Sequence, residues 1–247
     1  MKSLKHYPVL LMAVVLTFAV SCKKEEEKEE EETPTAADTS APTPTFSEGS
    51  GSLVAIKSQS TTQSPIGPIE TSIGLAVASF YANGNTGSLL DAGTVTVNSK
   101  SLSKQANNSY TYTPGTTDVS GIDFGSNVEW SVGGASSVAA FSYTTTITFP
   151  KITAITSSET VEKTSGYTLS ASGISGADSI IFQVGSVVKT LAGNSTACTF
   201  SSSELSGELA GTSIAQVAAY KWEDREHNSK TYYYVNETVV SKTITIK

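Results

Sequence analysis

The chain has 247 residues, of which 38% are hydrophobic and only 16% are charged, and its formal net charge is −7. A chain with this negative balance is repelled by phosphate backbones, which argues against nucleic-acid binding. Two cysteines and the one histidine that lies after Cys22, His227, are too few for a zinc site built from several such ligands. The many Ser, Thr, Gly and β-branched residues favour strands and tight turns over helices.

The first 21 residues are arranged like an export signal. Lys2 and Lys5 form a short basic region, and an apolar run follows from Val9 to Val20. This run has the length of the apolar part of a signal peptide and is too short to span a bilayer comfortably. Residues 1–21 are therefore predicted to be a cleaved lipoprotein signal peptide, and the alternatives are an uncleaved membrane anchor or an ordinary signal peptide followed by a chance cysteine.

Cys22 ends the stretch Ala19-Val20-Ser21-Cys22, which resembles the lipobox of bacterial lipoproteins. Ala19 stands where that motif most often has Leu. The resemblance implies that the Cys22 thiol receives diacylglycerol, that cleavage occurs before Cys22, and that acyl chains such as palmitate are attached. Several acyl chains on one residue anchor a protein stably, because each buried CH₂ contributes about 0.8 kcal/mol. The expected partner is therefore a membrane.

A run of charged residues with a strong excess of Glu over Lys follows Cys22. The run opens with Lys23, Lys24, Glu25, Glu26 and Glu27 and continues to Glu32. It resembles the export signal of surface lipoproteins of the Bacteroidetes group, which implies display on the outer face of the outer membrane. The periplasmic face is the alternative localisation. A solvated, self-repelling spacer has the same composition.

Residues 33–47 alternate Pro with Thr and have no apolar period, which predicts a disordered linker. Residues 22–51 are therefore expected to form a tether between the lipid and a folded region. Such a tether would hold the folded region several nanometres from the membrane, at about 3.1 Å per residue where Pro-rich.

From Ser52 onward, short runs of alternating apolar residues are separated by Gly, Asn, Asp and Ser, which is typical of an all-β sandwich or barrel. In the first half, strands are expected at Leu53–Ile56, Ile73–Tyr81, Thr94–Val97, Tyr110–Tyr112, Val128–Val132, Ala140–Tyr143 and Thr144–Phe149. In the second half, strands are expected at Tyr167–Ala171, Ser179–Val184, Ala197–Phe200, Ser213–Trp222, Tyr232–Val235 and Val239–Ile246, with one helical turn at Ser201–Leu205.

Pro150 and Lys151 mark a junction between two halves of about 100 residues, the size of an immunoglobulin-like sandwich. The predicted fold class is therefore all-β, with two tandem immunoglobulin-like β-sandwiches at 52–150 and 151–247. One larger sandwich is the alternative. The strand pattern of this region resembles the immunoglobulin-like modules of Bacteroidetes surface lipoproteins, although the antibody-type Cys-Trp-Cys arrangement is absent.

The polar loop Glu223–Lys230 contains His227, the one histidine left after signal cleavage. Glu223, Asp224, Glu226 and His227 could bind a metal weakly, but no Gly-containing calcium-loop spacing is present, which favours a charged hairpin tip with a surface histidine. Cys198 is expected to be a buried, inert thiol. The sequence predicts no catalytic residue, no metal site and no cofactor.

Aromatic residues are the one indication of ligand binding. A flat platform for stacking sugars could include Trp130, Trp222, Tyr232, Tyr233 and Tyr234. A core position for the tryptophans is the competing interpretation. Strand alternation places Tyr232 and Tyr234 on one face and Tyr233 on the other.

These observations predict a non-enzymatic cell-envelope lipoprotein whose immunoglobulin-like domains bind a partner or act as a spacer. The alternative is a glycan-binding accessory lipoprotein of a polysaccharide-uptake system, which rests on analogy of fold alone. The expected partner besides the membrane is a glycan or an envelope protein. A hydrolase that uses two facing carboxylates is a third hypothesis.

Overall fold

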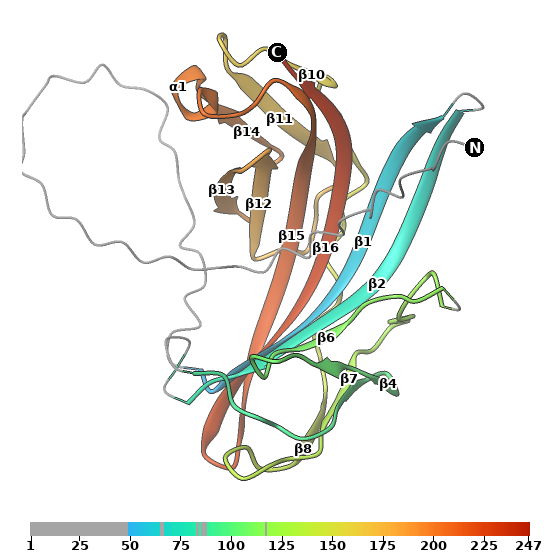
Figure 1. The fold of residues 1–247 in the computed structure, drawn as a ribbon, viewed down its shortest axis with the longest axis vertical. Coiled ribbons are helices and arrows are strands. Elements are labelled where there is room, and N and C mark those ends of the chain that lie inside the picture. Colours follow the sequence, from blue (N-terminus) through green and yellow to red (C-terminus); the bar gives the residue numbers. More distant parts are fainter. Residues whose placement is uncertain (1–48, 65–66, 83, 85–87, 117) are drawn as a thin grey trace, which may run out of the picture. The chain divides into compact units, whose positions relative to one another are not determined.

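A computed structural model describes residues 49–64, 67–82, 84, 88–116 and 118–247 (Figure 1). The predicted signal peptide, Cys22, the acidic run from Lys23 and the predicted linker at residues 33–47 all lie outside these residues. The described residues form an almost entirely β structure with several sheets, so the predicted all-β fold class is confirmed. The immunoglobulin-like topology stays a prediction.

A nine-stranded sheet, here called the central sheet, dominates the fold. Its strands follow the order β13 (Val187–Ala192), β12 (Ser179–Val184), β15 (Gly211–His227), β16 (Lys230–Ile246), β1 (Gly51–Ser64), β2 (Gly67–Phe80), β6 (Tyr110–Tyr112) and β5 (Ser103–Lys104), and β10 (Thr160–Val161) also pairs with β16. One smaller sheet is β4 (Lys100–Ser101), β3 (Val95–Val97), β7 (Glu129–Val132) and β8 (Phe141–Thr144). The other is β14 (Ala197–Phe200), β11 (Tyr167–Ser172) and β9 (Ala154–Ile155).

The hairpin of β15 and β16 is the longest unit of the sheet, with 17 residues in each strand (Figure 1). Its turn consists of Asn228 and Ser229 alone, and both have positive φ, as a tight two-residue hairpin turn requires. The polar loop predicted at Glu223–Lys230 is therefore wrong, because β15 continues to His227. The two strands predicted after Tyr232 are one strand, β16.

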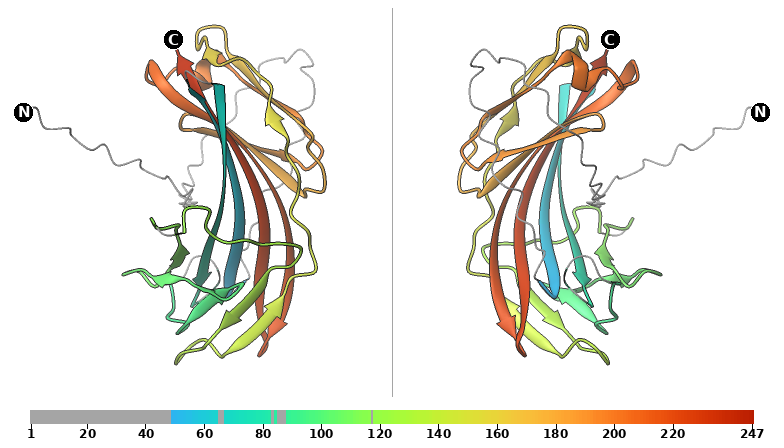
Figure 2. Two further views of the ribbon diagram at one scale, coloured as in Figure 1. Left: turned by 90° about the vertical axis from the view of Figure 1, so that its right-hand side faces the viewer. Right: turned by 90° about the vertical axis from the view of Figure 1, so that its left-hand side faces the viewer.

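The first described strand lies beside the last one. β1 pairs in parallel with β16, from Gly51 opposite Tyr232 to Thr61 opposite Lys242. β2 then pairs antiparallel with β1 along its full length. The four long strands β2, β1, β16 and β15 consequently run side by side, as both views in Figure 2 show.

Two hydrophobic cores lie on one face of the central sheet, here called the inner face. The first core joins Trp130 of β7 to Leu53, Tyr232 and Tyr234 of the central sheet. The second core uses Val240, Ile244 and Ile246 of β16. Since the even-numbered residues of β16 share one face, the same strand supplies both cores. The boundary predicted at residue 150 therefore does not separate the side chains of one core from those of the other.

The segment between the two cores crosses the inner face without forming a strand, so the strand predicted at Thr144–Phe149 is wrong beyond Thr144. In this segment, backbone carbonyls accept hydrogen bonds from side chains of β16 instead of from a neighbouring strand. Asn236 Nδ2 donates to the Ile147 carbonyl at 2.9 Å, and Thr238 Oγ1 donates to the Pro150 carbonyl at 2.7 Å. The alternation of Thr and apolar residues in 144–149 is typical of a strand. The Ile147 and Pro150 carbonyls nevertheless accept from the Asn236 and Thr238 side chains, and not from a strand backbone.

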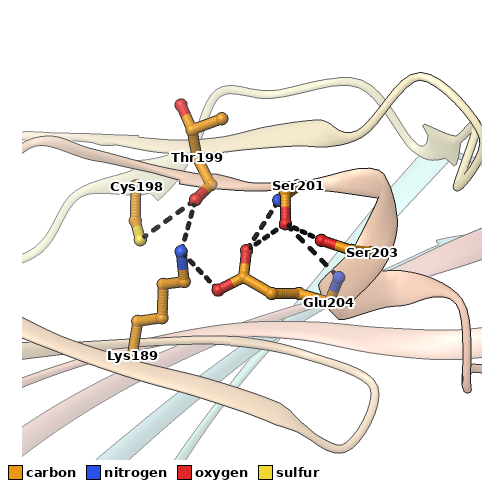
Figure 3. A network of polar contacts seen from close by, with 6 residues as sticks. All are labelled: Lys189, Cys198, Thr199, Ser201, Ser203 and Glu204. Atoms are coloured by element: carbon orange, nitrogen blue, oxygen red, sulfur yellow. Dashed lines mark hydrogen bonds and ion pairs between the residues drawn. The ribbon is translucent and has the colours of Figure 1, made fainter. Parts of the chain in front are cut away.

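The predicted helical turn is confirmed as α1 (Ser202–Leu205), and Figure 3 shows the polar contacts around it. Ser201 caps the helix, and the Glu204 carboxylate accepts the Ser201 backbone N–H at 2.7 Å, which completes a capping box. Lys189 of β13 pairs with Glu204 at 2.8 Å, and together with Ser201 it lowers the pKa of Glu204 to about 2. Cys198 lies buried beside this network, as predicted.

Candidate functional site

The five aromatic residues of the predicted sugar platform do not lie on one surface. Trp130 is completely buried in the first core, and its Nε1 has no hydrogen-bond partner among the described residues. Tyr232 and Tyr234 also belong to that core. Tyr233 points to the opposite face, where its ring meets Trp222 with centroids 5.7 Å apart at 67°. The predicted alternation of the three tyrosines is therefore confirmed. It places the residues of the predicted platform on opposite faces of the sheet.

The tip of the long hairpin is an aromatic cluster rather than a solvated loop. Its members, here called the tip cluster, are Phe141 and Tyr143 of β8, His227 of β15, and Tyr232 and Tyr234 of β16. The His227 and Phe141 rings stack with centroids 4.5 Å apart and planes 8° apart. Tyr143 and Tyr234 approach to 4.6 Å. The predicted surface histidine is thus half-buried, because β8 packs over the end of β15.

The polar atoms of the tip cluster are paired with each other. The Tyr234 hydroxyl lies 2.9 Å from His227 Nε2. Burial lowers the pKa of His227 and raises the pKa of Tyr234. Both side chains are therefore neutral at neutral pH, and their hydrogen bond joins two neutral groups inside an apolar cluster.

Glu223, one of the acidic residues near the tip, has structural partners, whereas Asp224 and Glu226 are exposed. Glu223 accepts the Thr146 backbone N–H at 2.7 Å and lies 3.2 Å from the Arg225 guanidinium. Arg225 Nε donates to the Tyr143 hydroxyl at 2.7 Å. Within the described part of the chain, no three His, Cys, Asp or Glu side chains are placed to hold a metal ion. The charges of Glu223 and Arg225 therefore fix the hairpin tip against β8.

Two other carboxylates are each held by a lysine and a tyrosine. Asp91 accepts from Lys104 at 2.8 Å and from the Tyr110 hydroxyl at 2.8 Å, and these contacts with the Gly93 N–H lower the pKa of Asp91 to about 2. Asp118 accepts from Lys100 and from Tyr112, and its pKa is also lowered. A general acid needs a raised pKa, so neither carboxylate suits that role.

A groove of about 510 Å³ opens on the inner face beside the first core. Its polar lining comes from Lys57 and Gln59 of β1, Ser72 of β2, and Ser120 and Asp123 of the loop that follows β6. The Lys57 ammonium lies 4.3 Å from the centre of the Phe149 ring. The groove thus offers a cation, a carboxylate, an amide and two hydroxyls to a small polar ligand.

Gly74 of β2 is one of the residues that line this groove. It donates to the Ser120 carbonyl at 2.9 Å and accepts from the Ile122 N–H at 3.0 Å. A Cβ on Gly74 would lie 1.8 Å from the Ile122 carbonyl oxygen, so only glycine permits this contact. Sequence reasoning missed the groove, although a glycine inside a strand pattern is a signal of close backbone approach.

No protein-family model matches the sequence, and neither the curated proteins nor the solved structures include a significant match. None of the helices among the described residues has the length and apolar character to cross a bilayer. The conclusions about function therefore depend on the sequence motifs and on the geometry given above.

Proposed function

We propose that the protein is a non-enzymatic lipoprotein of the bacterial outer membrane, anchored through Cys22 and displayed at the cell surface. The single observation that carries this proposal is the order of segments: a basic and apolar leader, Ala19-Val20-Ser21-Cys22, an acidic run, and a Pro/Thr linker. A folded region begins directly afterwards, at β1. Such an order suits a domain tethered to a membrane through a lipid.

The arrangement of the sheet supports a binding or spacer role. β1 starts opposite Tyr232, so the chain enters the central sheet at the end that holds the tip cluster. The opposite end of the sheet, near Ile246, is about 14 residues or 45 Å farther along β16 at 3.3 Å per residue. The two cores share β16, which makes the folded region a continuous support rather than two hinged domains.

Protease treatment of intact cells tests the proposal. The tagged wild type is compared with a Cys22→Ala variant and with a variant in which Glu25 to Glu32 are replaced by Ala. Surface display predicts cleavage of the wild type and protection of the acidic-run variant. Lipid anchoring predicts that labelled palmitate enters the wild type but not Cys22→Ala, which should keep its leader and run as a larger precursor. Equal labelling of the two proteins would overturn lipid anchoring. Wild type protected in intact cells but cut after lysis would place it in the periplasm.

The groove favours glycan binding as a second candidate function, because its polar groups match the hydroxyls of a sugar. Calorimetry with a panel of polysaccharides would test it. Asp123→Ala and Lys57→Ala should each weaken binding at least ten-fold. Asp224→Ala removes an exposed carboxylate elsewhere and should leave binding unchanged. Binding that is equal in all three variants would contradict the groove as the site.

A further inference from the structure

The groove on the inner face begins where the hairpin of β1 and β2 changes from apolar to polar. The first core reaches Ala55 of β1, which is completely buried. The next two inward residues of β1 are Lys57 and Gln59, and they lie opposite Gly74 and Ser72 of β2. Lys57 is half-buried, whereas Gln59 and Ser72 are exposed. The sheet therefore presents polar side chains to the groove, and not an uncovered apolar face.

The loop after β6 forms the opposite side of the groove, and the fold holds it in place. Gly121 has a φ of 73°, and a Cβ added to it would lie 2.1 Å from the Gly74 carbonyl oxygen. Asn98 Nδ2 donates to the Asp123 carbonyl at 3.1 Å. Phe124 is buried in the first core. Both sides of the groove are thus fixed by contacts that need no ligand, as in a preformed binding site.

The fold does not use the uncharged polar side chains of the groove. Among the described residues, the side chains of Gln59, Ser72 and Ser120 have no hydrogen-bond partner. The carboxylates of Asp91 and Asp118, outside the groove, each accept from a lysine and a tyrosine. The donors and acceptors of the groove therefore stay available to a ligand.

Lys57 is the cation of the groove, and an aromatic ring fixes its position. The Lys57 ammonium lies 4.3 Å from the centre of the Phe149 ring, which in turn packs 5.2 Å from the Phe124 ring. No carboxylate in the described part of the chain forms an ion pair with Lys57. The ring attracts the charge but accepts no strong hydrogen bond, so the N–H donors of this half-buried ammonium are suited to an anion.

Asp123, the carboxylate of the groove, is in a different position. Its Oδ1 accepts the Gly125 N–H at 3.0 Å, and the residue is exposed to water. The half-buried cation therefore needs a partner of opposite charge more than the exposed carboxylate does. The volume of about 510 Å³ lies within the range of about 300–1,000 Å³ that is typical of small-molecule sites. The expected ligand is thus small, rich in hydroxyls and negatively charged.

We infer that the groove recognises an acidic sugar, a uronic acid unit of a glycan. The ligand carboxylate pairs with Lys57, while the ring hydroxyls bond with Gln59, Ser72 and Asp123. A neutral sugar leaves Lys57 without a charged acceptor, and a charge-assisted hydrogen bond is about twice as strong as a neutral one. Lys57 therefore determines which sugars bind. This inference rests on glycan binding by the groove and names the class of glycan.

Two matched pairs of ligands test this specificity. The probes are short oligomers of galacturonic acid and of glucuronic acid, each compared with its methyl ester, which keeps the rings and hydroxyls but carries no charge. Calorimetry with the full chain in detergent should show about ten-fold tighter binding of at least one acid than of its ester. Lys57→Gln should reduce the affinity for that acid to the affinity for its ester, and Lys57→Arg should keep the preference. Lys247→Gln removes a surface lysine whose side chain is 59% exposed, and it should change neither affinity.

The possible results separate this inference from glycan binding itself. Equal affinities for acids and esters, both reduced by Asp123→Ala, would keep the groove as a glycan site and overturn recognition of a carboxylate. A preference for the acid that persists in Lys57→Gln would also overturn the role of Lys57. Absence of binding by all four probes would contradict glycan binding and the inference together. Tighter binding of a glucosamine oligomer than of either acid would assign recognition of charge to Asp123. Circular dichroism and the melting temperature verify that Lys57→Gln is folded.

Discussion

The Tyr234 hydroxyl lies 2.9 Å from His227 Nε2, and this bond connects the two strands of the long hairpin inside the tip cluster. His227 also stacks on Phe141 of β8, so one imidazole links the central sheet to the smaller sheet. Burial lowers the pKa of His227 below its ordinary value of 6.5. A histidine that is harder to protonate in the folded state than in the unfolded state makes stability depend on pH.

Replacement of His227 by Gln should reduce this pH dependence. Since the folded pKa is lowered, the contribution of His227 is present above pH 6.5 and is lost as the pH falls through the folded pKa. The wild type should therefore lose more stability between pH 7 and pH 5 than His227→Gln does. Urea denaturation at both pH values measures the difference. Parallel losses in the two proteins would show that His227 does not titrate differently on folding.

Glu237→Gln should change the pH dependence of stability in the opposite direction. Desolvation raises the pKa of Glu237 from 4.5 to about 7, so the protonated carboxyl stabilises the fold below pH 4.5 and this stability is lost as the pH rises towards 7. At pH 8 the Gln variant should exceed the wild type by about 1–3 kcal/mol in free energy of unfolding, whereas at pH 4 the two should be equal. Comparison at each pH cancels the contribution of His227. A wild type more stable than the variant at pH 8 contradicts the desolvation of the Glu237 carboxyl.

Two substitutions of Trp130 should lower the free energy of unfolding by different amounts. Trp130→Ala leaves a large cavity in the first core and should cost about 3–5 kcal/mol. Trp130→Phe keeps much of the ring and removes an Nε1 group that has no partner within the described structure, so it should cost clearly less, about 1–2 kcal/mol. Chemical denaturation followed by circular dichroism measures both. Equal costs would mean that Nε1 has a partner, such as an ordered water.

Gly74→Ala should damage the groove and the fold together. The new methyl group would meet the Ile122 carbonyl at 1.8 Å, so β2 and the loop after β6 must separate at a cost of about 2–4 kcal/mol. Gly115→Ala is the matched control, because no atom lies within 4 Å of its added Cβ. A shift in melting temperature for Gly74→Ala alone is the expected result. Equal shifts in both variants would place the loop elsewhere.

Local patterns in the sequence predicted local structure well. Alternating apolar residues gave the positions of β7, β11 and β12, and Ser201 with Glu204 gave the capped turn of α1. The hairpin tip was misinterpreted because Glu223 and Arg225 look solvated in sequence. In the structure, the Thr146 N–H donates to Glu223 and the Tyr143 hydroxyl accepts from Arg225, and these partners are about 80 residues away in sequence.

The candidate sites depend on long-range pairing, which a single sequence does not reveal. The groove requires Gly74 to meet Ser120 and Ile122. The first core requires β1 to lie parallel to β16, and no turn connects those two strands. Five aromatic residues were predicted to form one platform. The structure brings the rings of Trp222 and Tyr233 together, but it places the other three in the first core: Trp130, Tyr232 and Tyr234.

The parallel contact between β1 and β16 also sets the order in which the chain can fold. Leu53 and Tyr234 belong to the same core and are partners in that strand pair, yet they lie far apart in sequence. Closing so large a loop is slow, and the first core stays incomplete until the last strand is available. A chain crossing a membrane from its N-terminus would therefore stay unfolded during transport. Final folding would follow the arrival of β16 on the far side, with both cores forming in one cooperative step.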